Sequence, residues 1–234
     1  SGSSNVAVGE GALESNTTAN NNVSIGRNSM NANTTGFNNV AVGTEAFQNN
    51  TTASNNAAFG RRACKANTTG TLLTAVGQGA LESNTTANSN TAVGCNALNL
   101  NTTGANNTAV GDAALTANTT GDHVTAVGYR AAVVNTTGRG HAVLGANALT
   151  ANTTGEKSTA IGMSSLENAT TGNKNTAVGN NSGNSLTTGT NNLCLGNDAG
   201  ISGSPFNLTT SSNRVIIGDS NISNAYIQVD WTIT

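Results

Sequence analysis

The chain has 234 residues and a net charge of −2, and charged residues make up only 9% of it. Nine scattered Lys and Arg residues argue against a nucleic-acid partner, and no apolar run approaches the roughly 18 residues that span a bilayer. Hydrophobic residues at 35% and aromatic residues at 3% would alone suggest disorder. The apolar residues nevertheless recur at fixed positions, which a disordered chain does not require.

A glycine recurs every 17 residues without insertion, and we count positions in each unit from this glycine as position 0. The repeat glycines are Gly9, Gly26, Gly43, Gly60, Gly77, Gly94, Gly111, Gly128, Gly145, Gly162, Gly179 and Gly196. The consensus is NTAVGxxALxxNTTGxx, as in NTAVGCNALNLNTTGAN from Asn90. A short fixed period predicts one structural unit stacked on itself, which gives a rod its reach and rigidity.

The three residues before each glycine predict a β-strand. Position −1 is always apolar, position −3 is Val, Ala, Thr or Leu, and position −2 is Ala in nine units. Because side chains alternate along a strand, we assign positions −3 and −1 to the core and the alanine row to the opposite face. A row of small apolar side chains permits close approach of another chain, so it predicts packing in a homotrimer. A wall that faces solvent is the alternative.

The rest of the unit supports stacked β-coils. A small residue at position +3 precedes a usually large one at position +4, and the NTTG stretch predicts a second strand or a turn. A helix is excluded because glycine and Thr-Thr pairs are poor in helix interiors and no stripe of period 3.6 is present. We therefore predict an all-β fold, a parallel β-solenoid of about twelve coils over residues 1–204. Asn and Thr rows should hydrogen-bond from coil to coil, and each glycine should turn with positive φ.

The register breaks after Gly196, where Pro205 interrupts the repeat, and the motif NRVIIGDSN returns 22 residues later at Gly218. Beyond it, four apolar residues alternate with polar ones and predict a half-buried strand: Ile227, Val229, Trp231 and Ile233. Such an apolar strand needs a partner, most simply from sister chains. Residues 205–234 are therefore expected to form a C-terminal β cap that acts as a trimerisation segment.

No constellation in the sequence indicates catalysis, a cofactor or a bound metal. The eleven acidic residues do not stack in pairs, and no GxxxxGK motif is present. His123 and His141 occupy neighbouring positions of successive coils but lack a third ligand, and exposed loop histidines are the simpler interpretation. The three cysteines occupy three different positions of the repeat, so neither zinc nor a disulfide framework is indicated.

Two groups of large or charged residues interrupt the repeat. The first, in coils eight and nine, comprises Tyr129, Arg130, Arg139 and His141. The second, in coil four, comprises Arg61, Arg62 and Lys65. Aromatic and Arg side chains suit contact with a glycan or a protein, so the first group is a candidate receptor patch. Tolerated drift at exposed turns is the alternative for both.

The units NTAVGxxALxxNTTG resemble repeats of bacteriophage tail-fibre proteins, and their AVGxxA centre is similar to the head repeat of YadA-type trimeric adhesins. That likeness implies a left-handed β-roll that is trimeric about its long axis. The stretch SNRVIIGDSNISNAYIQVDWTIT resembles the segment upstream of endosialidase-type intramolecular chaperones, which trimerise fibres and then cut themselves off at a serine. This resemblance implies that Thr234 is the C-terminus left by self-cleavage.

The expected function is that of a non-enzymatic fibre shaft in a virion, a homotrimer that contacts other tail proteins and a host-surface glycan or protein. The head of a bacterial trimeric adhesin remains open, and so does an ice-binding solenoid, because Thr rows on a flat face are used for that purpose. Adjacent threonines of a strand point to opposite faces, so only one Thr row is expected to face outward.

Overall fold

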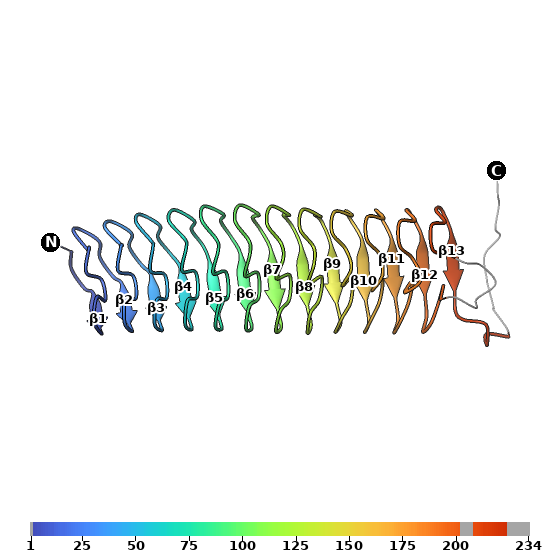
Figure 1. Ribbon diagram of the computed structural model, residues 1–234, viewed down its shortest axis with the longest axis horizontal. Coiled ribbons are helices and arrows are strands. Elements are labelled where there is room, and N and C mark those ends of the chain that lie inside the picture. The colour runs from blue at the N-terminus through green and yellow to red at the C-terminus, as the bar shows by residue number, and fades with distance from the viewer. Residues whose placement is uncertain (1, 202–207, 224–234) are drawn as a thin grey trace.

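The computed structural model describes residues 2–201 and 208–223, which form a rod of stacked coils with the first strand at one end and the thirteenth at the other (Figure 1). The described residues contain thirteen three-residue strands and no helix. The strands are β1 (Val6–Val8), β2 (Val23–Ile25), β3 (Val40–Val42), β4 (Ala57–Phe59), β5 (Thr74–Val76), β6 (Thr91–Val93), β7 (Thr108–Val110), β8 (Thr125–Val127), β9 (Ala142–Leu144), β10 (Thr159–Ile161), β11 (Thr176–Val178), β12 (Leu193–Leu195) and β13 (Val215–Ile217). The prediction of an all-β parallel solenoid is confirmed.

All strands belong to one sheet, in which each pairs in parallel with the next in chain order. Thr91 pairs with Thr108 and Val93 with Val110, so each repeat position stacks on its own equivalent 17 residues along. After the break in register, Leu193 pairs with Val215 across a 22-residue interval, and β13 continues the sheet. The predicted strand from Ile227 and the processed terminus lie outside the described residues.

Coil-to-coil hydrogen bonds continue around the turns. The Leu98 amide donates to the Ala114 carbonyl at 3.0 Å, and the Thr102 amide donates to the Thr119 carbonyl at 3.0 Å. The NTTG stretch is a bend in every coil rather than a second strand. Backbone groups outside the sheet are therefore paired along the rod as well.

The repeat glycine is required by geometry. Gly43 has φ of +138°, and a Cβ built there would lie 2.6 Å from the carbonyl oxygen of Gly60 in the next coil. An L-residue avoids that φ, and the contact is with backbone that is fixed by its own hydrogen bonds. The prediction that each glycine turns with positive φ is confirmed.

Three further positions of each coil adopt left-handed conformations. In the sixth coil these are Asn96 (φ 53°), Leu98 (φ 51°) and Asn106 (φ 60°). Asn adopts the left-handed region readily, whereas this conformation destabilises Leu98 by about 1–2 kcal/mol relative to a right-handed one. Leu98 is fully buried, and burying such a side chain contributes about 1.5–3 kcal/mol, which offsets the strain.

The predicted assignment of the two strand faces is wrong. The alanine row, including Ala92 and Ala109, is fully buried, whereas Val93 at position −1 is 36% exposed. The coil is thin, and its interior is already occupied by position +4 residues such as Leu98, so only a small side chain fits at position −2. The larger residues of positions −3 and −1 therefore cover the outer face of the sheet.

Two rows of buried asparagines complete the core, as the sequence predicted for Asn rows. At position +7, Asn101 Nδ2 donates to Asn84 Oδ1 at 3.0 Å and to the Gly104 carbonyl at 2.9 Å. At position +13, Asn107 Nδ2 donates to the Gly121 carbonyl at 2.9 Å. Thr rows bond similarly, with Oγ1 of one coil donating to the Thr carbonyl of the next, as in Thr102 at 3.0 Å. The Thr link repeats along the rod from Thr17 to Thr187, whereas the Asn rows are interrupted where another residue replaces asparagine, as at Leu73 and Val124. These links let neighbouring coils stabilise one another.

Candidate interaction surface

The outer face of the sheet carries an uninterrupted apolar row at position −1. Its members are Val8, Ile25, Val42, Phe59, Val76, Val93, Val110, Val127, Leu144, Ile161, Val178, Leu195 and Ile217. All are exposed or half-buried, up to 61% exposed at Ile217. Each interior member stacks between its equivalents in the neighbouring strands, and within residues 2–201 and 208–223 the outer side of the row stays exposed or half-buried.

Position −3 forms a second outer row, of Val, Thr, Ala and Leu, beside the first. β-branched and apolar side chains thus cover a flat face that runs the length of the rod. Monomeric proteins rarely leave a continuous apolar face of this extent in water, so this face is the principal candidate interaction surface.

The sizes of the side chains in the sequence indicate which face of the strand is buried. Position −2 never exceeds Val across β1–β12, as expected where space is limited, whereas position −1 ranges from Val8 to Phe59, as expected on an open surface. Hydrophobicity alone favoured the opposite assignment.

The predicted receptor patch does not form one surface. Tyr129 is 52% exposed and, with the exposed Arg130, lies in the turn that follows β8. Arg139 lies in the turn that precedes β9, where its Nε donates to Glu156 Oε1 at 2.9 Å. His141 is only 2% exposed, so its place in an exposed patch is ruled out.

His141 instead replaces the asparagine of the position +13 row. Its Nε2 lies 2.7 Å from the Gly155 carbonyl, and its Nδ1 accepts the Ser158 amide at 3.1 Å. Nε2 must therefore carry the proton of the neutral ring. Burial lowers the pKa of His141 below its ordinary value. The other histidine, His123, is exposed beside Asp122 at 3.4 Å, and the described residues contain no group of three or more potential metal ligands.

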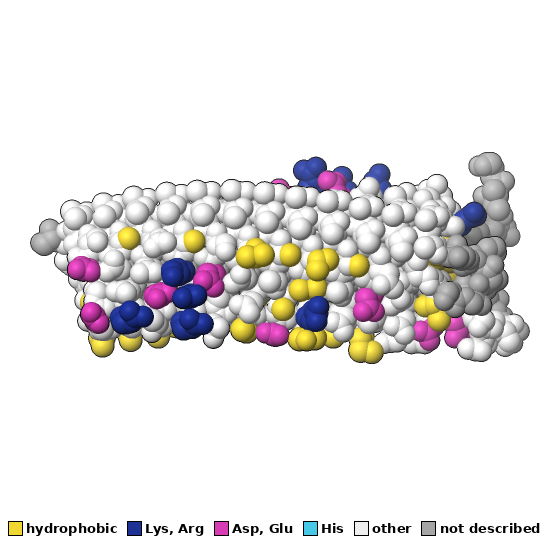
Figure 2. Space-filling model, viewed as in Figure 1, with side chains coloured by type: hydrophobic (Ala, Val, Ile, Leu, Met, Phe, Trp, Pro, Cys, Tyr) yellow, Lys and Arg dark blue, Asp and Glu magenta, His cyan; other side chains and the backbone are white. Residues whose placement is uncertain are grey.

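The cations of coil four are mostly engaged within the chain. Glu45 accepts Lys65 at 2.7 Å and Arg62 at 3.1 Å, and Arg27 lies 3.7 Å away. Arg62 also reaches Glu82 at 3.6 Å. The hydrogen bond and charge of Lys65, followed by those of Arg62, hold the pKa of Glu45 below its usual range. Figure 2 shows this end of the rod with positive and negative side chains intermingled, as expected of a network that links coils.

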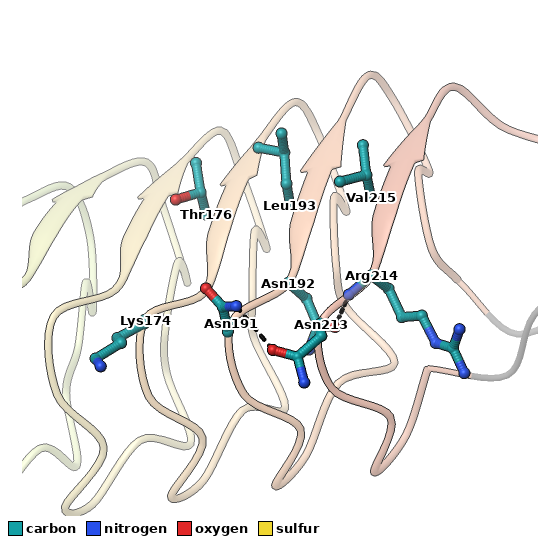
Figure 3. Close-up of a pocket in the computed structure, with 8 residues that line it drawn as sticks. All are labelled: Lys174, Thr176, Asn191, Asn192, Leu193, Asn213, Arg214 and Val215. Carbon is teal, nitrogen blue, oxygen red and sulfur yellow. Dashed lines mark hydrogen bonds between the residues drawn. The ribbon is translucent and has the colours of Figure 1, made fainter. Parts of the chain in front are cut away.

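A groove follows the edge of the sheet where its last strands begin (Figure 3). It is lined by Lys174, Thr176, Asn191, Asn192, Leu193, Asn213, Arg214 and Val215. Asn191 Nδ2 donates to Asn213 Oδ1 at 2.8 Å, which continues the exposed position +12 row. Within residues 2–201 and 208–223, neither Lys174 nor Arg214 has an ion-pair partner. Two cations without acidic partners therefore border the apolar face.

The two Thr rows at positions +8 and +9 differ in exposure. Position +8 residues such as Thr102 are half-buried and use their hydroxyls between coils, whereas position +9 residues such as Thr103 are exposed. Because the pair lies in a bend, the first row is not turned fully inward as expected for a strand. The outer row presents one threonine per coil.

The cysteines are separate in the structure as well. Cys64 and Cys194 are buried and Cys95 is exposed. Burial raises the pKa of Cys194 to about 11 and raises that of Cys64 further. Of the three thiols, Cys95 is the one that solvent reaches.

Among the residues that the structure describes, no helix combines the length and apolar character needed to cross a membrane. The chain matches no protein-family model, no curated protein and no solved structure.

Proposed function

We propose that this chain is the shaft of a homotrimeric fibre, a structural and adhesive protein of a bacteriophage tail that helps to hold the virion at the host surface. The observation that carries the proposal is the apolar row at position −1, which is exposed or half-buried along thirteen stacked strands. The sequence predicts trimer packing through the alanine row. Because that row is buried, we assign the trimer contact to the opposite, outer face of the sheet.

The size of this face supports association. Fully burying a Val, Leu or Ile side chain contributes about 1.5–3 kcal/mol, so covering a residue about two-fifths exposed contributes about 0.5–1 kcal/mol. Thirteen such residues would together contribute about 6–13 kcal/mol for each chain. Bringing chains together costs about 4–15 kcal/mol. The apolar row thus suffices to bring association within reach, and contacts beside it would determine its strength.

The oligomeric state tests the trimer directly. We expect sedimentation equilibrium of the purified chain to give three times the monomer mass of 23.2 kDa. Replacing Val93 and Val110 by Lys should shift the protein toward monomer, because three like-charged faces would meet at one axis. The matched control places Lys at Thr103 and Thr120, exposed residues of the same coils on a different surface. A wild-type monomer at all accessible concentrations would refute the trimer.

The phage assignment rests on the sequence resemblance and has its own test. Peptides of this chain should be found by mass spectrometry in purified virions. The gene beyond residue 234 should encode an intramolecular chaperone. Heptads followed by a membrane anchor at that place would instead favour the adhesin head.

The exposed Thr row favours a second candidate, an ice-binding solenoid. Twelve threonines at position +9 are exposed and stack one per coil, about 4.8 Å apart. The row is single, whereas a flat ice-binding face would prefer two outward threonines separated by one residue. Thermal hysteresis at micromolar protein, abolished by Val at Thr103 and Thr120, would support this candidate over the fibre.

A further inference from the structure

The exposed sheet face has two long edges with different charged residues. Positions +11 to +13 precede each strand and form its starting edge, and positions +1 and +2 follow the glycine and form its finishing edge. The groove in Figure 3 lies on the starting edge, where Lys174 and Arg214 stand beside Thr176 and Val215. The two edges are therefore the parts of each chain that border the apolar rows.

Two strands carry charges at both edges, and in each the signs are opposite. β8 is preceded by Asp122 and followed by Arg130. β13 is preceded by Arg214 and followed by Asp219. No strand from β1 to β13 has like charges at its two edges at neutral pH.

These charges cannot pair within one chain. Asp122 and Arg130 are separated by the whole of β8, and an extended chain spans about 3.3 Å per residue, well beyond the reach of an ion pair. Asp122 contacts only the His123 ring at 3.4 Å among its charged neighbours, and Arg130 has no ion pair in the described part of the chain. Asp219 accepts the backbone amide and the side-chain amide of Asn221, each at 2.9 Å, and in the described part of the chain neither Asp219 nor Arg214 has an ion pair. The complementary charges are therefore available to a second surface.

We propose that the neighbouring copy of this chain supplies that surface, with the starting edge of one sheet face against the finishing edge of the next. Asp122 then pairs with the partner's Arg130, and Arg214 pairs with the partner's Asp219. This arrangement rests on the homotrimer proposed above and specifies its contacts, polarity and register.

A closed ring of three chains explains why residues at the same level match. In cyclic symmetry all chains run in the same direction without axial displacement, so each strand meets its own equivalent. A displacement by one coil that sets the starting edge of β8 against the finishing edge of β7 would bring Asp122 toward the partner's Asp112. The charges therefore favour the unstaggered register and disfavour that shift.

Lys174 fits the same arrangement. It precedes β11, and Asp198 on the opposite edge follows β12. The Asp198 carboxylate accepts Asn181 Nδ2 at 3.1 Å, which turns it toward the level of β11. Lys174 can therefore reach the partner's Asp198, and both cations of the groove acquire an acidic counterpart.

The dimensions of the face agree with a ring of three. From position +13 to position +1 the face is about 16 Å wide, since extended residues span about 3.3 Å each. A triangle with that side leaves about 5 Å from each sheet to the axis. Val and Thr side chains fill such a depth, and they are the usual residues of the two outer rows.

Charge reversal with rescue tests the pairing. Asp122→Arg and Arg130→Asp should each weaken the trimer about tenfold per interface at low salt, and the double variant should restore it. Asp112→Arg is the matched control, because the edge that precedes β7 carries neutral Asn106 and Asn107 and offers it no charged counterpart. Sedimentation equilibrium at two salt concentrations measures each constant.

A disulfide gives a second measurement that does not depend on affinity. With Cys95→Ser to remove the exposed native thiol, Asp122→Cys combined with Arg130→Cys should oxidise to covalent trimers on a non-reducing gel. Each single-cysteine variant should give no covalent trimer. Wild-type trimers without charge rescue and without covalent trimers would overturn the pairing and leave the trimer standing. A monomeric wild type would remove both.

Discussion

The buried Asn row at position +7 makes a quantitative prediction about stability. We consider Asn118→Ala in the middle of the rod. Asn118 is fully buried, and its Nδ2 donates to Asn101 Oδ1 at 2.8 Å and to the Gly121 carbonyl at 2.9 Å. Its Oδ1 accepts Asn135 Nδ2 at 3.0 Å. The substitution therefore removes three buried hydrogen bonds.

The consequences for the former partners differ. The Gly121 carbonyl still accepts Asn107 Nδ2, and Asn135 Nδ2 still donates to the Gly138 carbonyl. Among the described residues Asn101 Oδ1 accepts from no donor other than Asn118, so the substitution leaves it buried without a partner. Leaving such an acceptor unpaired costs about 1–3 kcal/mol, and each of the other lost bonds costs about 0.5–1.5 kcal/mol. The expected loss in the free energy of unfolding is about 2–6 kcal/mol.

Denaturant unfolding followed by circular dichroism measures this loss, with all proteins at one concentration because association shifts stability. The control is Thr120→Ala in the exposed row of the same coil, which should change stability by no more than about 0.5 kcal/mol. A loss below about 1 kcal/mol for Asn118→Ala would show that the row is not held by these bonds and would falsify the reasoning.

Four further outcomes are expected. Gly43→Ala should prevent the local stacking of coils, seen as protease cleavage near that turn, because its Cβ would meet the next backbone 2.6 Å away. The pKa of His141 is lowered on folding, so stability should be complete above its unfolded value of 6.5 and fall as pH drops below it. His141→Asn restores the consensus residue and should remove that dependence, which thermal melts at pH 7.5 and 5.5 compare directly. The pKa of Glu45 is likewise lowered, so its contribution is present above its usual 4.5 and is lost as pH falls through the folded pKa. Glu45→Gln should reduce stability by about 0.5–1 kcal/mol at pH 7 and by nothing measurable well below that pKa. A thiol reagent should label Cys95 alone in the native protein and all three cysteines after denaturation, and equal labelling of the native thiols would contradict their assigned burial.

Part of this protein was determined by the sequence itself. The unbroken 17-residue spacing set the stacking, because identical residues recurring without insertion can satisfy one another only when each coil lies on the last. Gly43 and its equivalents revealed the turn, since only glycine tolerates that φ beside another backbone. Asn101 and its equivalents revealed the hydrogen-bonded rows, because a polar residue repeated inside a thin coil needs a partner above or below.

The tertiary structure decided which side of the strand is inside. The side chains of a three-residue strand alternate between two faces. Which face is buried depends on how much space the opposite turn leaves, and Leu98 and its equivalents leave only enough for a small residue such as alanine. The same assignment of the strand faces explains why His141 is buried and Val93 is exposed. The structure also shows that Asp122 and Arg130 lie at opposite edges of the exposed face, because one precedes β8 and the other follows it. Sequence periodicity thus determined which residues stack on one another, and side-chain volume determined which face of the strand is exposed.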